Sequence, residues 1–142
     1  MTKEEMLTGI NSRSGFNKHN GIRVTDFGEG FCVVEAELKP EAQNPWGMAH
    51  GGFVYSMCDV AAGVCVAVSG KRGVTLSSNL YFLHRSEGSR LRCEGRIAKP
   101  GSNVVLVDTS VYDETGRNTA RGTFEVYIVK EETPDEALRN SK

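Results

Sequence analysis

The segment that decides the fold is WGMAHGGFVYSMCDVAAGVCVAVSG, residues 46–70. Between Phe53 and Val68 every residue is apolar or small, apart from one carboxylate, Asp59. This stretch is shorter than the roughly 20 apolar residues that a membrane span requires. It therefore predicts a buried core helix, from about Gly51 to Ser69, in a soluble protein. Because such a helix is apolar all round, other elements must surround it on most sides.

Strand-like segments lie on both sides of this helix. Residues 21–40 predict two strands around the turn FGEG, and four more strands are expected over 74–83, 90–98, 104–112 and 119–130. Short turns such as KPGS and DETGR join successive strands, so we expect an antiparallel meander. A short helix over 2–12 and a frayed polar tail over 131–142 complete a single domain, 1–142. One apolar helix against a curling antiparallel sheet is an α+β fold.

The composition excludes several classes of protein. The formal net charge is −1 and 25% of the residues are charged, so no overall field attracts nucleic acid or an anionic membrane. The three histidines are scattered, and the four cysteines lack metal-ligand spacing, so we expect no metal. Reduced thiols, together with a charged N-terminal segment that lacks the apolar run of a signal peptide, predict a cytoplasmic protein.

Asp59 is the first candidate for chemistry. Aspartate is unfavourable inside a helix, and an unpaired buried carboxylate is costly. No Lys or Arg lies three or four residues away on either side to pair with it. The alternative is a carboxylate on one wet stripe of the helix, but these two costs favour a functional role. Cys58 is expected on another helix face, and no GxSxG motif supports a serine nucleophile.

The second candidate is the sequence AHGG, residues 49–52, at the start of the helix. Glycines there leave the first backbone N–H groups accessible, and these donors favour an oxyanion or a phosphate. A glycine-rich helix start with no ligand is the alternative reading, and His50 is equally compatible with a structural and a functional role. Phosphate-loop motifs are absent, so a nucleotide site is not indicated.

The spacing of the two candidates predicts an oligomeric site. Gly51 and Asp59 are eight residues apart, which is about 12 Å along a helix. Both groups cannot touch one reacting carbonyl from the same chain. If two helices pack antiparallel about a two-fold axis, however, Asp59 of one subunit approaches Gly51 of the other. We therefore expect a homodimer with sites shared between subunits.

The stretch NPWGMAHGGFVYSMCDVAAG resembles the signature of hotdog-fold acyl-CoA thioesterases, in particular the phenylacetate-degradation branch. Asn44, the His50-Gly51-Gly52 triplet and Asp59 match that signature in identity and spacing. The resemblance extends over residues 20–130. It implies a curved antiparallel sheet wrapped around one long central helix, in a dimer that often pairs into a homotetramer.

The resemblance also implies roles for individual residues. Gly51 would hold the oxyanion with its N–H, and Asp59 of the neighbouring subunit would act as general base or nucleophile. Asn44 would position water or the thioester, while His50 would support the loop. Supporting residues are expected on the third strand, where Thr75 matches an assisting Ser/Thr position and Ser77 is a rival for it.

Substrate binding is implied for Gly52, Ser77, Arg85 and Arg90, the last two as contacts to coenzyme A phosphates. Many relatives carry an Arg-Pro pair after the third strand, whereas this chain reads FLHRSEG. Coenzyme A enters as part of the substrate, and no separate cofactor is expected. Aromatic and apolar side chains that could line the acyl pocket are Phe53, Tyr55, Met57, Tyr81 and Phe82.

The leading hypothesis is hydrolysis of an acyl- or aryl-CoA thioester to the carboxylate and free coenzyme A. One alternative is a non-catalytic acyl-CoA-binding hotdog module, which usually lacks the helix carboxylate. Another is a dehydratase or hydratase, which would need a His and an acid converging on the substrate α-carbon. The pattern of Asn44, Gly51 and Asp59 suits attack by water better.

Overall fold

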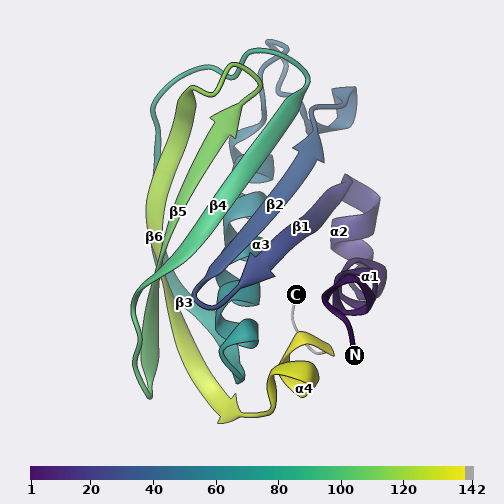
Figure 1. Cartoon of the computed structure of the whole chain (residues 1–142). Helices are drawn as coiled ribbons and strands as arrows, with labels where there is room; N and C mark the ends of the chain where they lie inside the picture. The colour runs from purple at the N-terminus through teal and green to yellow at the C-terminus, as the bar shows by residue number, and fades with distance from the viewer. Residues whose placement is uncertain (140–142) are drawn as a thin grey trace.

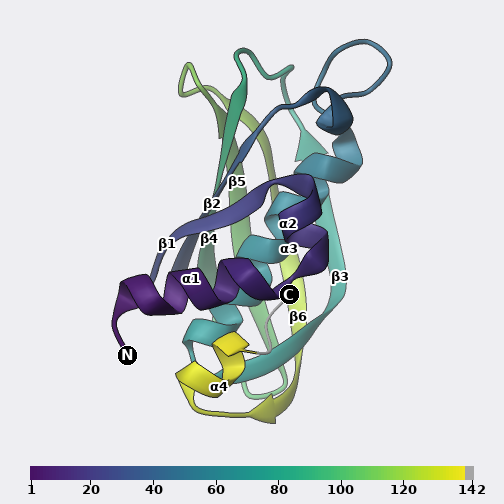
Figure 2. The ribbon, with the colours of Figure 1, turned by 90° about the vertical axis from the view of Figure 1, so that its right-hand side faces the viewer.

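The computed structural model describes residues 1–139, and these form one curved sheet around a central helix. The sheet has six antiparallel strands in the order β1-β2-β4-β5-β6-β3. Figure 1 shows α3 behind the sheet, and Figure 2 shows β1 and β3 on opposite sides of that helix, with α1 across the open side. In chain order the elements are α1 (Lys3–Arg13), α2 (Gly15–Asn20), β1 (Ile22–Gly28), β2 (Phe31–Glu37), the 3-10 turn η1 (Pro40–Ala42), α3 (Gly51–Val68), β3 (Lys71–Phe82), β4 (Arg90–Lys99), β5 (Val104–Asp113), β6 (Asn118–Glu131) and α4 (Pro134–Arg139).

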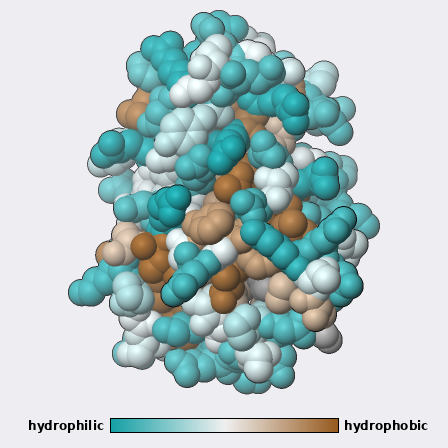
Figure 3. Space-filling view, viewed as in Figure 1, coloured by the Kyte–Doolittle hydropathy of each residue, from teal (hydrophilic) through white to brown (hydrophobic). Residues whose placement is uncertain are grey.

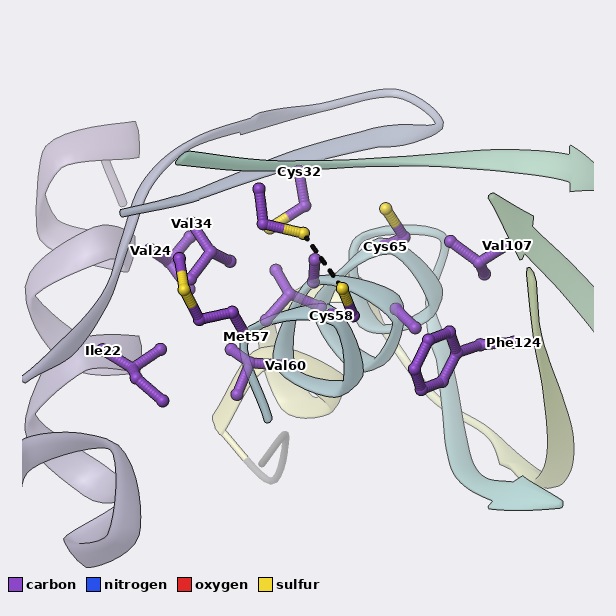
Figure 4. Close-up of a cluster of buried hydrophobic side chains, with 14 of the residues drawn as sticks. Ile22, Val24, Cys32, Val34, Met57, Cys58, Val60, Cys65, Val107 and Phe124 are labelled. Atoms are coloured by element: carbon purple, nitrogen blue, oxygen red, sulfur yellow. Dashed lines mark hydrogen bonds between the residues drawn. The ribbon is translucent and has the colours of Figure 1, made fainter. Parts of the chain in front are cut away.

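The central helix forms as expected, and its apolar surface fills the concave face of the sheet. Met57 and Cys58 are fully buried among side chains of the strands, in the core that Figure 4 shows. The helix approaches β4 closely because Gly95 has no side chain: a Cβ there would lie 3.2 Å from the Cβ of Ala61. By length and composition α3 could cross a membrane, but it is a mostly buried core helix here.

The strand pairing differs from the expected meander in one respect. Strands β4, β5 and β6 follow each other through hairpins, but β3 pairs with β6 rather than with β4, and β2 pairs with β4 instead. The chain therefore crosses from one edge of the sheet to its interior between β3 and β4. As a result β3, the strand that follows α3 directly, is an edge strand with one neighbour.

Both termini are more structured than expected. The capping box between Thr2 and Glu5 starts α1, as the sequence predicts, but the second helix α2 was not expected. The tail was expected to be frayed, whereas Pro134–Arg139 form α4, which packs against α3 and buries Ala137. Residues 140–142, the last part of that predicted tail, lie outside the described residues.

The convex face of the sheet is turned away from α3 and is largely hydrophilic, with hydrophobic residues gathered in its middle and lower part (Figure 3). Exposed apolar side chains on β3 and β6 include Val74, Leu76, Tyr127 and Val129. Val74 and Leu76 lie on the edge strand β3, which has a neighbouring strand of the same chain on one side only.

Candidate active site

The N-terminus of α3 combines a side-chain cap with an accessible backbone donor. His50 is the N-cap, and its Nδ1 accepts a hydrogen bond of 2.9 Å from the Gly52 N–H. Gly51 is the first residue of the helix, so its own N–H has no acceptor within the helix. The imidazole thus occupies the second donor and leaves the first directed out of the helix. In this structure His50 is therefore the N-cap of α3.

Both glycines of the HGG triplet have close neighbours on the side where a Cβ would stand. At Gly52 an added Cβ would lie 3.1 Å from Nδ1 of His50, so any side chain there would disturb the cap. At Gly51 it would lie 3.4 Å from the ring of Phe82, at the end of β3. Glycine at 52 therefore permits the His50 cap, whereas a Cβ at 51 would make only an ordinary van der Waals contact with Phe82.

A cavity of about 370 Å³ opens beside the Gly51 backbone. Asn44, Gly51, Phe82 and Arg85 line it, together with Val54 from the first turns of α3. The Asn44 side-chain oxygen accepts hydrogen bonds from the backbone N–H groups of Trp46 (2.9 Å) and Met48 (3.0 Å), which fixes the loop before the helix. Further lining residues are Met48, Ala49, Leu83, His84, Ser86, Thr119 and Ala120.

Asp59 lies two turns further along α3 and does not line this cavity. Its carboxylate accepts a hydrogen bond of 2.5 Å from the hydroxyl of Thr75 on β3. Between the two groups, the hydroxyls of Tyr55 and Ser78 are 2.7 Å apart and also join α3 to β3. The carboxylate and the helix N-terminus of one chain are thus separate, as the helical rise of about 1.5 Å per residue requires.

The structure distinguishes the two candidates on β3. Thr75 faces α3 and reaches Asp59, while Ser77 lines a polar hollow of about 760 Å³ on the convex face, formed by β3, β5 and β6. A β-bulge between Thr75 and Ser77 interrupts the pairing with β6. This hollow is the larger of the two, but neither Asp59 nor Gly51 lines it.

The remaining sequence candidates divide between different places. Arg85 joins the Gly51 cavity, whereas Arg90 lies at the start of β4 in a separate hollow with Arg23 and Lys39. Among the aromatic and apolar candidates for an acyl pocket, Phe82 alone lines the cavity. Phe53 and Met57 are buried in the core, Tyr55 packs against Phe124, and Tyr81 lines the convex hollow.

Cysteine and metal chemistry have little structural support within the described residues. Cys58 is fully buried, and its sulfur lies 3.8 Å from that of Cys93. Cys65 lies two helical turns after Cys58 on α3. Burial raises the pKa of its thiol to about 12, so this thiol stays protonated. Across residues 1–139, no three His, Cys, Asp or Glu side chains are grouped to hold a metal ion.

Sequence reasoning did not single out Arg117, which lies beside the cavity without lining it. Arg117, in the hairpin between β5 and β6, lies with one guanidinium nitrogen 2.8 Å from Nδ1 of His84, which lines the cavity. The segment DETGR indicates a turn, and nothing in its local pattern shows which other loop it meets.

Comparison with known proteins places these observations in a family. Residues 47–120 match the family model described as the thioesterase superfamily. A protein of Streptococcus mutans solved with bound acetyl-CoA is 26% identical, with a TM-score of 0.75 over 79% of this chain and 91% of that one. A hypothetical thioesterase of Streptococcus pneumoniae solved with coenzyme A gives the same identity, TM-score and coverage.

The fold is also that of the PaaI protein from the phenylacetic acid degradation operon of Escherichia coli. The TM-score is 0.84 over 91% of this chain and 94% of that one, at 18% identity. The curved sheet around one long helix is therefore a hotdog fold, as the sequence resemblance implied.

Proposed function

The chain belongs to the thioesterase superfamily and is a thioester hydrolase, and from this we propose that it hydrolyses acyl- or aryl-CoA thioesters at a site shared by two subunits. In this proposal the Gly51 N–H of one subunit binds the thioester oxygen. Asp59 of the other subunit activates water or attacks the carbonyl directly. The observation that carries the proposal is the pair of contacts that β3 makes with α3.

These contacts lie near opposite ends of β3. Thr75, near the start of the strand, bonds to Asp59, and Phe82, at its end, lies against Gly51. An edge strand presents unpaired backbone N–H and C=O groups that a second strand can use. If two β3 strands pair antiparallel about Ser78, Thr75 of one lies opposite Tyr81 of the other, one residue from Phe82. Asp59 of one subunit then comes next to Gly51 of its partner.

A solved relative supports the pairing of Asp59 with Thr75. Two further structures of the Streptococcus pneumoniae thioesterase, each 25% identical to this chain, are of alanine variants. One replaces an aspartate and the other a threonine sixteen residues later in that chain. Asp59 and Thr75 are separated by the same 16 residues and are joined by a hydrogen bond here.

The chemistry follows from what each group can do. The N–H of the first helical residue, strengthened by the helix dipole, stabilises the negative charge that develops on the thioester oxygen. The Asp59 carboxylate, oriented by the Thr75 hydroxyl, either takes a proton from the attacking water or forms an anhydride with the acyl group. The thiolate of coenzyme A leaves. On the anhydride route, water then hydrolyses the anhydride and regenerates Asp59, and on either route the carboxylic acid is released.

Assembly and location are part of the same proposal. We propose a homodimer formed through β3, with a homotetramer formed by pairing of dimers, and a cytoplasmic protein. All four cysteines are free and buried, which suits a reducing compartment. The phosphates of coenzyme A would contact basic side chains near the cavity, of which Arg85 is one.

The test is thiol release from a panel of aromatic and aliphatic CoA thioesters, measured for the wild type beside Asp59→Asn. We expect the variant to lose roughly 10²–10⁴-fold in turnover while remaining folded, the range for removal of a general base. A matched control is Asp108→Asn, because Asp108 also accepts a hydrogen bond from a threonine, Thr123, but on the convex face. Normal turnover in Asp59→Asn would refute the assignment, and tight binding without hydrolysis by the wild type would favour the binding module.

A further inference from the structure

Two loops meet beside the Gly51 cavity: residues 83–89, which follow β3, and residues 113–117, which form the hairpin between β5 and β6. Figure 2 shows both at the upper end of the molecule. The backbone N–H groups of Leu83 and His84 donate to the carbonyl of Thr119, just beyond the hairpin. The start of the first loop is thus anchored to β6.

The carboxylate of Asp113 joins the rest of the two loops. One oxygen accepts hydrogen bonds from the Thr115 N–H (2.9 Å), the Thr115 hydroxyl (2.6 Å) and the Arg117 N–H (3.2 Å). The other oxygen accepts a bond of 2.9 Å from the Glu87 N–H in the opposite loop. Aspartate at the start of a turn often bonds within the turn, but the bond to Glu87 lies outside it. The second oxygen is therefore the atom through which Asp113 links the hairpin to the opposite loop.

Asp113 is held in its charged form by these donors. The residue is only 6% exposed. The Thr115 hydroxyl, followed by the N–H groups of Glu87, Arg117 and Thr115, lowers the pKa of the Asp113 carboxyl to about 2, against the opposing effect of burial. The carboxylate is therefore ionised at neutral pH, and its oxygens are already engaged, so it is unsuited to contact an anionic substrate itself.

The loops that Asp113 joins carry basic side chains. A guanidinium can only donate hydrogen bonds, so His84 accepts from Arg117 through Nδ1 and carries its proton on Nε2. The neighbouring Arg85 lines the same cavity as His84 and Gly51. We call these three hydrogen-bond donors the basic rim: His84, Arg85 and Arg117. Such donors match the oxygens of a phosphate.

We propose that Asp113 is a positioning residue for substrate binding: by clamping the two loops it holds the basic rim where the phosphates of the coenzyme A carrier bind. This rests on the proposed function, because it takes the thioester to lie at Gly51. The occupant is the phosphate part of the carrier, since His84 and Arg85 of the rim line the same cavity as the Gly51 backbone.

The test compares two thioesters with the same acyl group, one of coenzyme A and one of N-acetylcysteamine, which has no phosphate. For Asp113→Asn and for Arg117→Gln we expect KM for the CoA thioester to rise about tenfold, the scale of one charge-assisted contact. We expect kcat to stay within about twofold, and KM for the N-acetylcysteamine thioester to stay unchanged. Arg121→Gln, an exposed arginine on the convex side of β6, is the matched control.

A double variant distinguishes positioning from an independent effect. If Asp113 acts through Arg117, the combined Asp113→Asn and Arg117→Gln variant has the same KM as Arg117→Gln alone. Multiplied effects would overturn the proposal, as would an equal rise in KM with both thioesters. If Asp113→Asn does not fold, an unchanged KM for the CoA thioester in Arg117→Gln overturns it instead.

Calorimetric titration of free coenzyme A into the same variants separates this inference from the proposed function. Affinity should fall about tenfold in Arg117→Gln and in Asp113→Asn, whether or not the wild type releases thiol. Absence of thiol release from both thioesters, with this loss of affinity, would refute the hydrolysis and leave the rim in place. Unchanged affinity in both variants would refute the rim.

Discussion

At the scale of single residues, Asp59 illustrates how a carboxylate is retained inside an apolar helix. It lies on a face of α3 that is only partly buried, and the Thr75 hydroxyl on the neighbouring strand donates to it. The hydrogen bond fixes the orientation of the carboxylate, so little conformational entropy is lost when the carboxylate reacts. If Asp59 is the catalytic carboxylate that we propose, we expect this hydrogen bond to contribute to activity as well as to the folded state.

We predict that Thr75→Val lowers kcat by roughly tenfold, because it removes a donor to a charged group without changing the volume of the side chain. Thr75→Ser keeps the hydroxyl and should retain most of the activity. Steady-state kinetics of both variants on one CoA thioester, with thermal unfolding in parallel, measure the effect. Equal losses in Thr75→Val and Thr75→Ser would contradict a role specific to the hydroxyl, and a loss in Thr75→Ser alone would assign the effect to the methyl group.

Part of the site could be predicted from residues alone. Asp59 and the glycines at 51 and 52 are recognisable because they violate the local pattern of an apolar helix. The choice between Thr75 and Ser77 could not be made, since the β-bulge that turns them to different faces leaves no trace in the alternation of the strand. Arg90 illustrates the same limit for distant groups, because its position depends on where β4 lies in the sheet.

At the scale of elements, the strands could be predicted but their order could not. Periodicity located all six strands within a few residues. Pairing partners depend on contacts between distant segments, and the connection over 83–89 is long enough to let β4 pair with β2 instead of β3. The helix α4 was missed because its sequence is largely polar and shows no amphipathic pattern, although Ala137 is buried where α4 packs against α3.

The two loops joined by Asp113 should be sensitive to acid. The folded-state pKa of this carboxyl is about 2, below its ordinary value of about 3.9. Its contribution to stability is therefore complete above about pH 4 and is lost as the pH falls toward 2. Urea unfolding of the wild type and Asp113→Asn across this range should show a difference that shrinks with falling pH. A difference independent of pH would mean that ionisation of Asp113 plays no part.

At the scale of the whole molecule, the proposed site requires two chains. The edge strand β3 exposes Leu76 to 59% and Val74 to 47%, and it carries at its two ends the contacts to Asp59 and Gly51. An unprotected apolar edge is a hazard for a monomer, but it is a usable surface for a symmetric dimer. In the proposed dimer, the contact that covers this edge would also complete the site.

A charge at the edge should separate the subunits. We predict that Leu76→Glu yields monomers and loses most of the activity, because two like charges would come close to the two-fold axis. Val129→Glu, an equally exposed apolar residue on the interior strand β6, should leave at least a dimer. Analytical ultracentrifugation gives the oligomeric state of each variant. A fully active monomer of Leu76→Glu would contradict the shared site.

The most direct measurement mixes two inactive variants. Asp59→Asn lacks the carboxylate, and Gly51→Val places a side chain against Phe82 where the thioester oxygen would bind. When the two are unfolded together and refolded at equal amounts, each mixed dimer contains one site with both changes and one site with neither. We predict recovery of about a quarter of wild-type activity, since half of the dimers are mixed and each has one intact site of two. Mixed dimers that form and remain as inactive as their parents would contradict a site shared between subunits.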